Sequence, residues 1–386
     1  MNTFVYSYPV KVYFGVKAAE AHLASELAKV GQNVLLAYGA GSIKKNGIYE
    51  ELTGILKAAG KNVTEFSGIM SNPTYAKVQE GAKLAREHQI DFILAVGGGS
   101  VIDCCKVVSA QAKCDEDLWE LETVRHGAPA ELIPMGAVVT AFGTGAEMNN
   151  GAVITNEEKK VKGPLWGAFY SFAILDPTYT ISMPMRQVIS GSFDALSHCM
   201  ETYMGSPREA NLSDEINEAC QRNIIRNLRA TLKNPDDITA RSELIWAAAM
   251  AENGILKIGK VTDFQAHMLE HQLGAYTDCN HGQGLAVIHP ALYRHMLPEA
   301  AAQFARLAVN VWGIDPAGKT QEDLAGAFID ALTAFLREVG LLDTFSGMGI
   351  AEDTDYKAVA DSTVLTAGCC KRFTREELLT VLNECK

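Results

Sequence analysis

Apolar and polar positions follow one pattern in the first half of the chain and another in the second. Up to about residue 183, short apolar runs that mostly end at glycine alternate with amphipathic stretches of helical period. The runs are 33–39, 62–68, 91–99 and 134–142, and the stretches between them are 47–60, 75–88 and 100–112. Near-continuous apolar runs are typical of strands buried on both faces of a parallel sheet. The pattern therefore predicts a doubly wound α/β domain with a parallel sheet.

Two further segments complete this first half. Residues 1–15 alternate like a strand, and residues 152–177 predict two strands around a charged turn at Glu157–Lys160. From Met185 onward helical periodicity dominates, with helices predicted over 194–203, 214–232, 240–256 and 321–339. A chain of 386 residues is long enough for two cores. We predict a dinucleotide-binding α/β domain over 1–183 and an all-α metal-binding, catalytic domain over 184–386.

Composition narrows the class of protein. The net charge of −12 leaves no basic stripe for phosphates, so no nucleic-acid partner is expected. The chain has no run of about 18 apolar residues and its start lacks the layout of a signal peptide, so neither a membrane span nor secretion is expected. Nine cysteines without a C-x-x-C motif indicate reduced, buried thiols in a cytoplasmic protein.

A glycine-rich turn joins a predicted strand to a predicted helix opened by Ser100. It consists of Gly97, Gly98, Gly99 and Ser100. Glycines let a phosphate approach the backbone, and the amides at a helix N-terminus bind anions. Because the spacing differs from G-x-G-x-x-G, a simple tight turn is the alternative. Asp103, one turn further on, is either a partner of the helix dipole or a ligand contact.

A second turn, at Gly39, Gly41 and Ser42, ends an earlier predicted strand. An acid directly after that strand would bind both hydroxyls of an adenosine ribose. The residue here is Gly39, which suits a 2′-phosphate, so NADP(H) is favoured over NAD(H). An ordinary loop with solvated lysines is the alternative. Thr140 and Thr144 follow another strand and are candidates for the nicotinamide side.

The second half carries candidate metal ligands. Asp194 and His198 stand four residues apart, as do His267 and His271, so each pair shares a helix face. His281 follows and precedes a glycine. One carboxylate with imidazoles suits Fe²⁺ or Zn²⁺. The HEXXH spacing of metalloproteases is absent, so peptide hydrolysis is not indicated.

Several motifs together resemble those of the iron-containing, metal-dependent alcohol dehydrogenase family, in its NADPH-dependent butanol dehydrogenase branch. They are FG at 14–15, YGAGSIKKNG at 38–47, NP at 72–73, AVGGGSVIDCCK at 95–106, GTGAEMNNGAVIT at 143–155, ILDPTYT at 174–180, D-A-L-x-H at 194–198 and H-x-x-x-H…H-G at 267–282. The resemblance covers essentially the full length. The chain has Ala146 where the family usually has serine, so any bond from that hydroxyl is absent here.

The resemblance implies roles for individual residues. The metal ligands would be Asp194, His198, His267 and His281, with His271 as a catalytic pocket residue near the substrate. The cofactor contacts would be Gly39, Gly41, Ser42, Asn72, Gly97, Gly98, Gly99, Ser100, Asp103, Thr140, Thr144 and Tyr179. A lysine of the hairpin also reaches the cofactor in this family, and Lys162 is favoured over Lys160.

The expected reaction is the interconversion of a small alcohol and an aldehyde, with hydride passing to or from NADP(H) and one divalent metal acting as a Lewis acid. A homodimer is possible. Two other classes stay open. One is a lyase resembling dehydroquinate synthase, which would need basic residues that 267–281 lacks. The other is a non-catalytic dinucleotide sensor.

Overall fold

The computed structural model describes residues 1–341 and 343–386. They form two compact units. One is an α/β unit of Ser7–Pro184, and the other is a helical unit that consists of Met185–Lys386 together with Met1–Tyr6. The predicted boundary after residue 183 lies beside this division, but it did not anticipate that the first residues would join the helical unit. The Asn2 amide donates a hydrogen bond to the Gly259 carbonyl at 3.0 Å, which attaches the N-terminus there.

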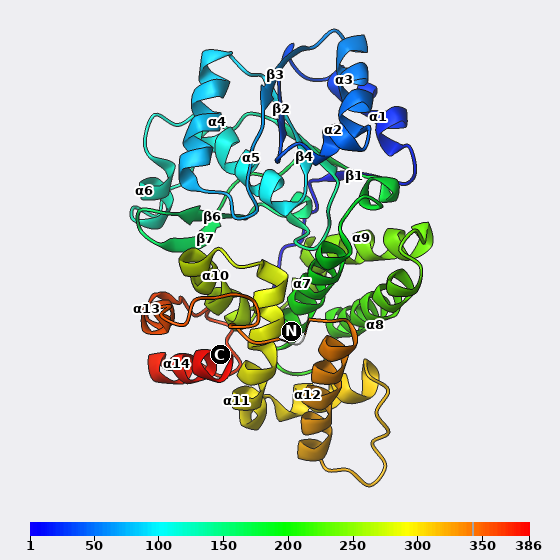
Figure 1. Ribbon diagram of the computed structural model, residues 1–386, viewed down its shortest axis with the longest axis vertical. Coiled ribbons are helices and arrows are strands. Elements are labelled where there is room, and N and C mark those ends of the chain that lie inside the picture. Colours follow the sequence, from blue (N-terminus) through cyan, green and yellow to red (C-terminus); the bar gives the residue numbers. More distant parts are fainter. Residues whose placement is uncertain (342) are drawn as a thin grey trace. The chain divides into compact units, whose positions relative to one another are not determined.

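The α/β unit is built on one parallel sheet with the strand order β1-β8-β5-β4-β2-β3 (Figure 1). Its strands are β1 Lys11–Phe14, β2 Asn33–Tyr38, β3 Asn62–Phe66, β4 Phe92–Gly97, β5 Met135–Val139 and β8 Phe172–Leu175. Every residue of the central β4 is buried, which explains its unbroken apolar sequence. The predicted doubly wound parallel sheet is confirmed.

Helices cover both faces of this sheet (Figure 1). They are α1 Ala18–Leu27, α2 Ser42–Lys45, α3 Ile48–Ala58, α4 Tyr75–Glu87, α5 Gly99–Gln111 and α6 Leu118–Thr123. The helices α1 and α3 pack into one apolar core with the sheet, whereas α4 and α5 pack together on the other side. The predicted hairpin is present as β6 Ala152–Asn156 and β7 Val161–Leu165, which pair antiparallel.

The strand order brings two turns together. The chain runs from β2 to β3 at the edge of the sheet and then returns to β4 on the other side of β2, with Tyr38 of β2 paired to Val96 of β4. The turns after β2 and β4 therefore lie side by side, at the topological switch point where doubly wound sheets bind ligands.

One predicted strand was largely wrong. Residues 1–15 alternate, but only Lys11–Phe14 forms a strand, paired in parallel with Phe172–Leu175 of β8. β8 is only four residues long, so it offers no partner for a longer edge strand. The preceding segment belongs in part to the other unit.

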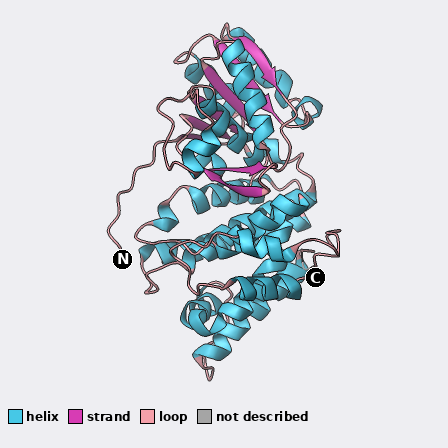
Figure 2. Cartoon of the chain, turned by 90° about the vertical axis from the view of Figure 1, so that its left-hand side faces the viewer, coloured by secondary structure: helices cyan, strands magenta, loops and turns pink. Residues whose placement is uncertain are grey.

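The helical unit contains no strand among its described residues (Figure 2). Its α-helices are α7 Met185–Tyr203, α8 Leu212–Lys233, α9 Ile238–Glu252, α10 Gln265–Thr277, α11 His281–Asn310, α12 Gln321–Glu338, α13 Tyr356–Ser362 and α14 Arg375–Glu384. Three short 3₁₀ turns, η1 Ala146–Met148, η2 Pro177–Thr180 and η3 Ile255–Lys257, complete the described elements of the chain. The helix α7 packs against α8, α9 and α11, so every residue from Ser192 to Tyr203 is buried.

Two sequence expectations can be compared directly with these elements. No helix in the described part of the chain has the length and apolarity needed to cross a membrane. All nine cysteines are free thiols, and six of them are buried.

Candidate active site

The buried helix α7 places a carboxylate and an imidazole on one face. Asp194 is 3% exposed and His198 is 7% exposed. The Nε2 atom of His198 lies 3.7 Å from Oδ1 of Asp194, as the four-residue spacing on a helix predicts.

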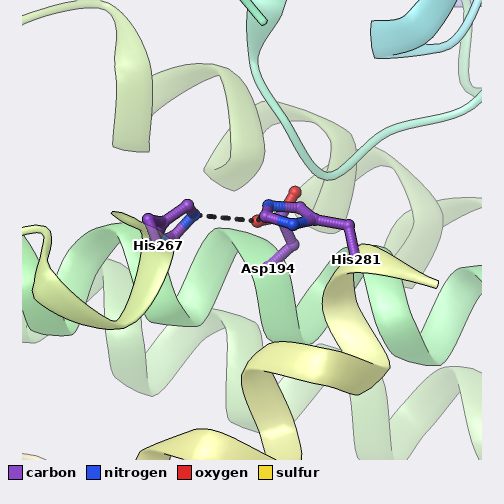
Figure 3. A group of neighbouring side chains, drawn as sticks. All are labelled: Asp194, His267 and His281. Carbon is purple, nitrogen blue, oxygen red and sulfur yellow. Dashed lines mark ion pairs between the residues drawn. The ribbon is translucent and has the colours of Figure 1, made fainter. Parts of the chain in front are cut away.

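Two other helices bring histidines to the same carboxylate (Figure 3). His267 lies in the first turn of α10 and His281 begins α11. The Nε2 atom of each lies 3.4 Å from Asp194 Oδ1. The ligand atoms of Asp194, His267 and His281 all lie within 4.8 Å of one another, close enough to hold one ion. His198 lies beside this group but outside that mutually close set, so its role as a fourth ligand stays a prediction.

A second layer of carboxylates orients the histidines. The Nδ1 atom of His267 pairs with Glu201 of α7, and that of His281 pairs with Glu270 of α10. These contacts leave Nε2 of each ring directed at Asp194. Carboxylates that hold the second nitrogen of a ligating histidine are a recurring feature of metal sites.

Sequence reasoning missed Glu201 and Glu270. A signal existed for both, since Glu201 stands seven residues after Asp194 on the same helix face and Glu270 follows His267 by three. Glu201 also accepts a hydrogen bond from the Ala266 amide at 2.6 Å, so it fixes the start of α10 as well as the His267 ring.

The close approach of these charged groups shifts the pKa values of Asp194 and of the histidines around it. Burial favours a raised pKa for Asp194, but His198, His281 and His267 outweigh it and hold that pKa well below its usual value. Burial favours a lowered pKa for His267, yet Glu201 and Asp194 raise it to about 10. Burial lowers the pKa of His198, despite the nearby Asp194. In the absence of a metal, a proton on His267 therefore offsets the buried carboxylates.

The residues present fit a divalent cation. In the described part of the chain, Asp194 Oδ1 and His267 Nε2 are shielded from solvent and make no hydrogen bond of good geometry. Buried polar atoms without such partners are costly, and a cation between them would satisfy both. One carboxylate with neutral imidazoles is a ligand set for Fe²⁺ or Zn²⁺.

His271 lies next to this cluster. Its ring centre is 5.4 Å from that of His281 and 5.9 Å from that of His267, and the residue is 5% exposed. Glu270, His271 and His281 form a second mutually close trio. We favour the trio with Asp194, because Glu270 already pairs with Nδ1 of His281.

Close packing of α11 against α7 explains why a glycine, Gly282, follows His281. A Cβ atom at this position would lie 2.2 Å from the backbone oxygen of Ser190 in α7. Only glycine lets the start of α11 come this close to α7, which brings His281 to Asp194.

In the α/β unit, the structure brings several predicted cofactor residues together. The helix α5 begins at Gly99, one residue before the predicted Ser100, with Gly98 as its N-cap. A Cβ atom at Gly99 would lie 2.2 Å from Oγ1 of Thr144, so the glycine-rich turn at 97–100 and Thr144 are in contact. The Thr140 amide donates to the Gly97 carbonyl at 3.0 Å, which places Thr140 at the same end of the sheet.

The Gly39 turn lies beside this one. Gly41 has a φ of 97° and precedes α2, whose first residue is Ser42. Ser100 donates a hydrogen bond to the Ser71 carbonyl, which brings the segment with Asn72 to the glycine-rich turn at 97–100.

Other predicted contacts have structural partners of their own. Asp103 accepts a hydrogen bond from the Val153 amide at 2.9 Å and lies 3.5 Å from the Lys106 ammonium, so it links α5 to β6. Tyr179 packs into the apolar core. Lys162 is 5% exposed within β7, whereas Lys160 is exposed at the turn. The roles of Asp103, Tyr179 and Lys162 as cofactor contacts stay predictions.

A parallel sheet with glycine turns at its switch point, in the same chain as a buried carboxylate–imidazole cluster, is the combination expected of a metal-assisted nicotinamide oxidoreductase. Comparisons with known proteins agree. Residues 9–177 match the iron-containing alcohol dehydrogenase family model, and residues 188–385 match the model of the C-terminal region of Fe-containing alcohol dehydrogenases.

Individual relatives span nearly the whole chain. The probable NADH-dependent butanol dehydrogenase 1 of Bacillus subtilis is 38% identical, with 99% of each chain covered. The NADPH-dependent aldehyde reductase YqhD of Escherichia coli is 35% identical over 91% of this chain and 90% of its own length. The crystal structure of NADH-dependent butanol dehydrogenase A from Thermotoga maritima has a TM-score of 0.93 and 32% identity, and the match covers 100% of this chain and 99% of that one.

The chain belongs to the iron-containing alcohol dehydrogenase family, whose members use a nicotinamide cofactor and a metal. It is an oxidoreductase that acts on alcohols. The lyase and the dinucleotide sensor that the sequence left open are therefore set aside.

Proposed function

We propose that this protein is an NADP(H)-linked aldehyde reductase and alcohol dehydrogenase with one divalent metal, Fe²⁺ or Zn²⁺, held by Asp194, His198, His267 and His281. The observation that supports this most is the approach of His267 and His281 to one oxygen of Asp194, at 3.4 Å each. When bound, the metal supplies a Lewis acid that polarises the substrate oxygen, and the nicotinamide carries the hydride.

The chain's own residues supply charge, orientation and a route for the proton. Asp194 carries the negative charge that a cation neutralises, while Glu201 and Glu270 fix the two histidine rings. His271 has an imidazole suited to hold or pass a proton near the substrate, and we assign it to the pocket and not to the metal.

The preference for NADP(H) rests on the turn after β2. Gly39 provides no carboxylate to repel a 2′-phosphate, and Ser42 begins α2 with a hydroxyl and an amide that can donate to one. The names of the relatives do not agree on the cofactor, since the Bacillus protein is called NADH-dependent and the Escherichia protein is called NADPH-dependent.

The test measures consumption of NADPH and NADH with a panel of short-chain aldehydes, including butanal, on protein loaded anaerobically with Fe²⁺ or Zn²⁺. We expect a higher kcat/KM with NADPH, and we expect Gly39→Asp to reverse or strongly narrow that preference by repulsion and a new ribose contact. Equal use of both cofactors by the natural chain would contradict the NADP(H) assignment. Loss of turnover on removal of the metal is also expected, and unchanged turnover would contradict the metal's role. The homodimer that the sequence allows is tested separately by light scattering.

A further inference from the structure

A polar cluster lies at the end of β3, beside the Gly39 turn. Its centre is Glu65, which accepts hydrogen bonds from the Tyr38 hydroxyl and, at 2.5 Å, from the Tyr49 hydroxyl. The ammonium of Lys44 lies 3.1 Å from Oε2 of the same carboxylate. Three donors from β2, α2 and α3 therefore converge on one acid.

The cluster holds two opposite charges in place. The Lys44 ammonium sits 5.1 Å from the centre of the Tyr38 ring and 4.4 Å from that of Tyr49, at distances typical of cation–π contacts. Hydrogen bonds from Tyr38 and Tyr49, with help from Lys44, keep the pKa of Glu65 below its usual value, so the carboxylate stays ionised at neutral pH. The pair is partly exposed, and such pairs contribute little to folding stability.

This cluster borders the position where a 2′-phosphate is proposed to bind. Lys44 is only two residues from Ser42 in the short helix α2. The chain that leaves β3 returns to the turn, because the Gly68 amide donates to the Gly39 carbonyl at 3.0 Å and the Ile69 carbonyl would lie 3.3 Å from a Cβ at Gly39. The turn after β2 has a glycine and not an acid at position 39, but the neighbouring strand β3 places the carboxylate of Glu65 beside it.

We propose that Glu65 is a specificity-determining residue that lowers the affinity for a 2′-phosphorylated cofactor, and that Lys44 offsets most of this effect. The proposal deepens the NADP(H) assignment and rests on it for the position of the phosphate. A carboxylate near a phosphate dianion repels it, whereas a ribose with two free hydroxyls carries no charge to repel. The pair therefore adjusts discrimination between the two cofactors without altering their common parts.

Direct binding tests this, with NADPH and NADH titrated by fluorescence, and adenosine 2′,5′-bisphosphate and ADP by calorimetry, all without substrate. The two tyrosine hydroxyls donate to different oxygens of Glu65, and Glu65→Gln keeps one of these oxygens and offers the other hydroxyl an amide N–H to accept. It should tighten NADPH binding by about fivefold, while Lys44→Met should weaken it by about fivefold. NADH affinity should change by less than about twofold in either variant. The double variant should return close to the natural chain, and every difference should shrink at high salt.

Two variants in α4 serve as matched controls. Glu87→Gln and Lys83→Met make the same charge changes at one exposed pair of the same unit, and neither should alter the ratio of NADPH to NADH affinity. The proposal is overturned if Glu65→Gln changes both affinities equally or not at all, as a purely structural role would. A double variant as weak as Lys44→Met would also overturn it. A natural chain that binds NADH better would overturn the NADP(H) preference, while the effect of Glu65 on the ratio would still be measurable.

Discussion

In the helical unit the candidate metal ligands are buried or half-buried side chains joined in one polar network. In the α/β unit, by contrast, most candidate cofactor contacts are backbone turns at strand ends. Two histidines of the network have a carboxylate on both sides: His267 lies between Asp194 and Glu201, and His281 between Asp194 and Glu270. The turns after β2 and β4 depend instead on strand order and on the absence of side chains at their glycines.

The difference teaches where each region is vulnerable. A buried network of charges is destabilised when one of its groups changes protonation state or when one partner is removed, because the remaining charge is then left uncompensated. Backbone turns have few titrating groups, so pH affects them little. They are disrupted instead by added side-chain atoms, because an extra Cβ occupies the space that a ligand or a neighbouring residue needs. Changes of charge should therefore affect the metal cluster most, and changes of shape should affect the cofactor turns most.

The largest expected effect is the response of the metal cluster to pH. His267 has a folded pKa of about 10, above its usual 6.5, so its contribution to stability is complete below pH 6.5 and is lost as pH rises through about 10. A metal must displace this proton, and although burial favours a lowered pKa for His281, Glu270 and Asp194 raise that pKa as well. Zn²⁺ affinity should therefore rise by at least roughly tenfold per pH unit, or about hundredfold or more from pH 6.5 to 8.5. The measurements are a competitive Zn²⁺ titration and thermal unfolding of the metal-free protein. A Zn²⁺ affinity independent of pH over that interval would contradict the charge balance described here.

A smaller effect is expected when the support of one histidine is removed. Glu201→Gln keeps the size of the side chain but loses the charge that pairs with Nδ1 of His267, and it should lower metal affinity by about tenfold or more. Glu218→Gln is a matched control, because Glu218 is also buried but bonds to Tyr203 and Asn310. Equal loss of metal affinity in both variants would show a general effect on folding instead of support for His267.

The smallest effect concerns the glycine-rich turn at 97–100, which is predicted to bind the phosphates of the cofactor. Gly99→Ala would place a Cβ 2.2 Å from Thr144 Oγ1, and the resulting shift should weaken NADPH binding by about tenfold without changing metal affinity. Gly54→Ala in α3 meets open space and should leave cofactor binding unchanged while stabilising the helix by up to about 1 kcal/mol. Fluorescence titration of NADPH with both variants checks this, and unchanged binding in Gly99→Ala would remove the evidence that the turn is tightly fitted.

Sequence patterns predicted the features that depend on local spacing. The apolar run of β4 and the four-residue step from Asp194 to His198 are both visible in the sequence, because burial and helix periodicity leave a direct trace. Glu201 and Glu270 were missed, since a carboxylate is common on any helix and only tertiary packing shows that it meets a histidine. Asp103 was read only as a dipole partner or a ligand contact, and its bond to the Val153 amide depends on a hairpin 50 residues further along the chain.

The central claim is that the metal is held by Asp194, His198, His267 and His281, with His271 outside the ligand set. The most direct measurement is the metal content of His267→Ala and His271→Ala, purified side by side under anaerobic conditions, with circular dichroism to check that both are folded. His267→Ala should lose the metal, because one nitrogen that faces Asp194 is gone. His271→Ala should keep it and show lower turnover or a changed pH profile. Loss of metal from both variants, or only from His271→Ala, would contradict the assignment.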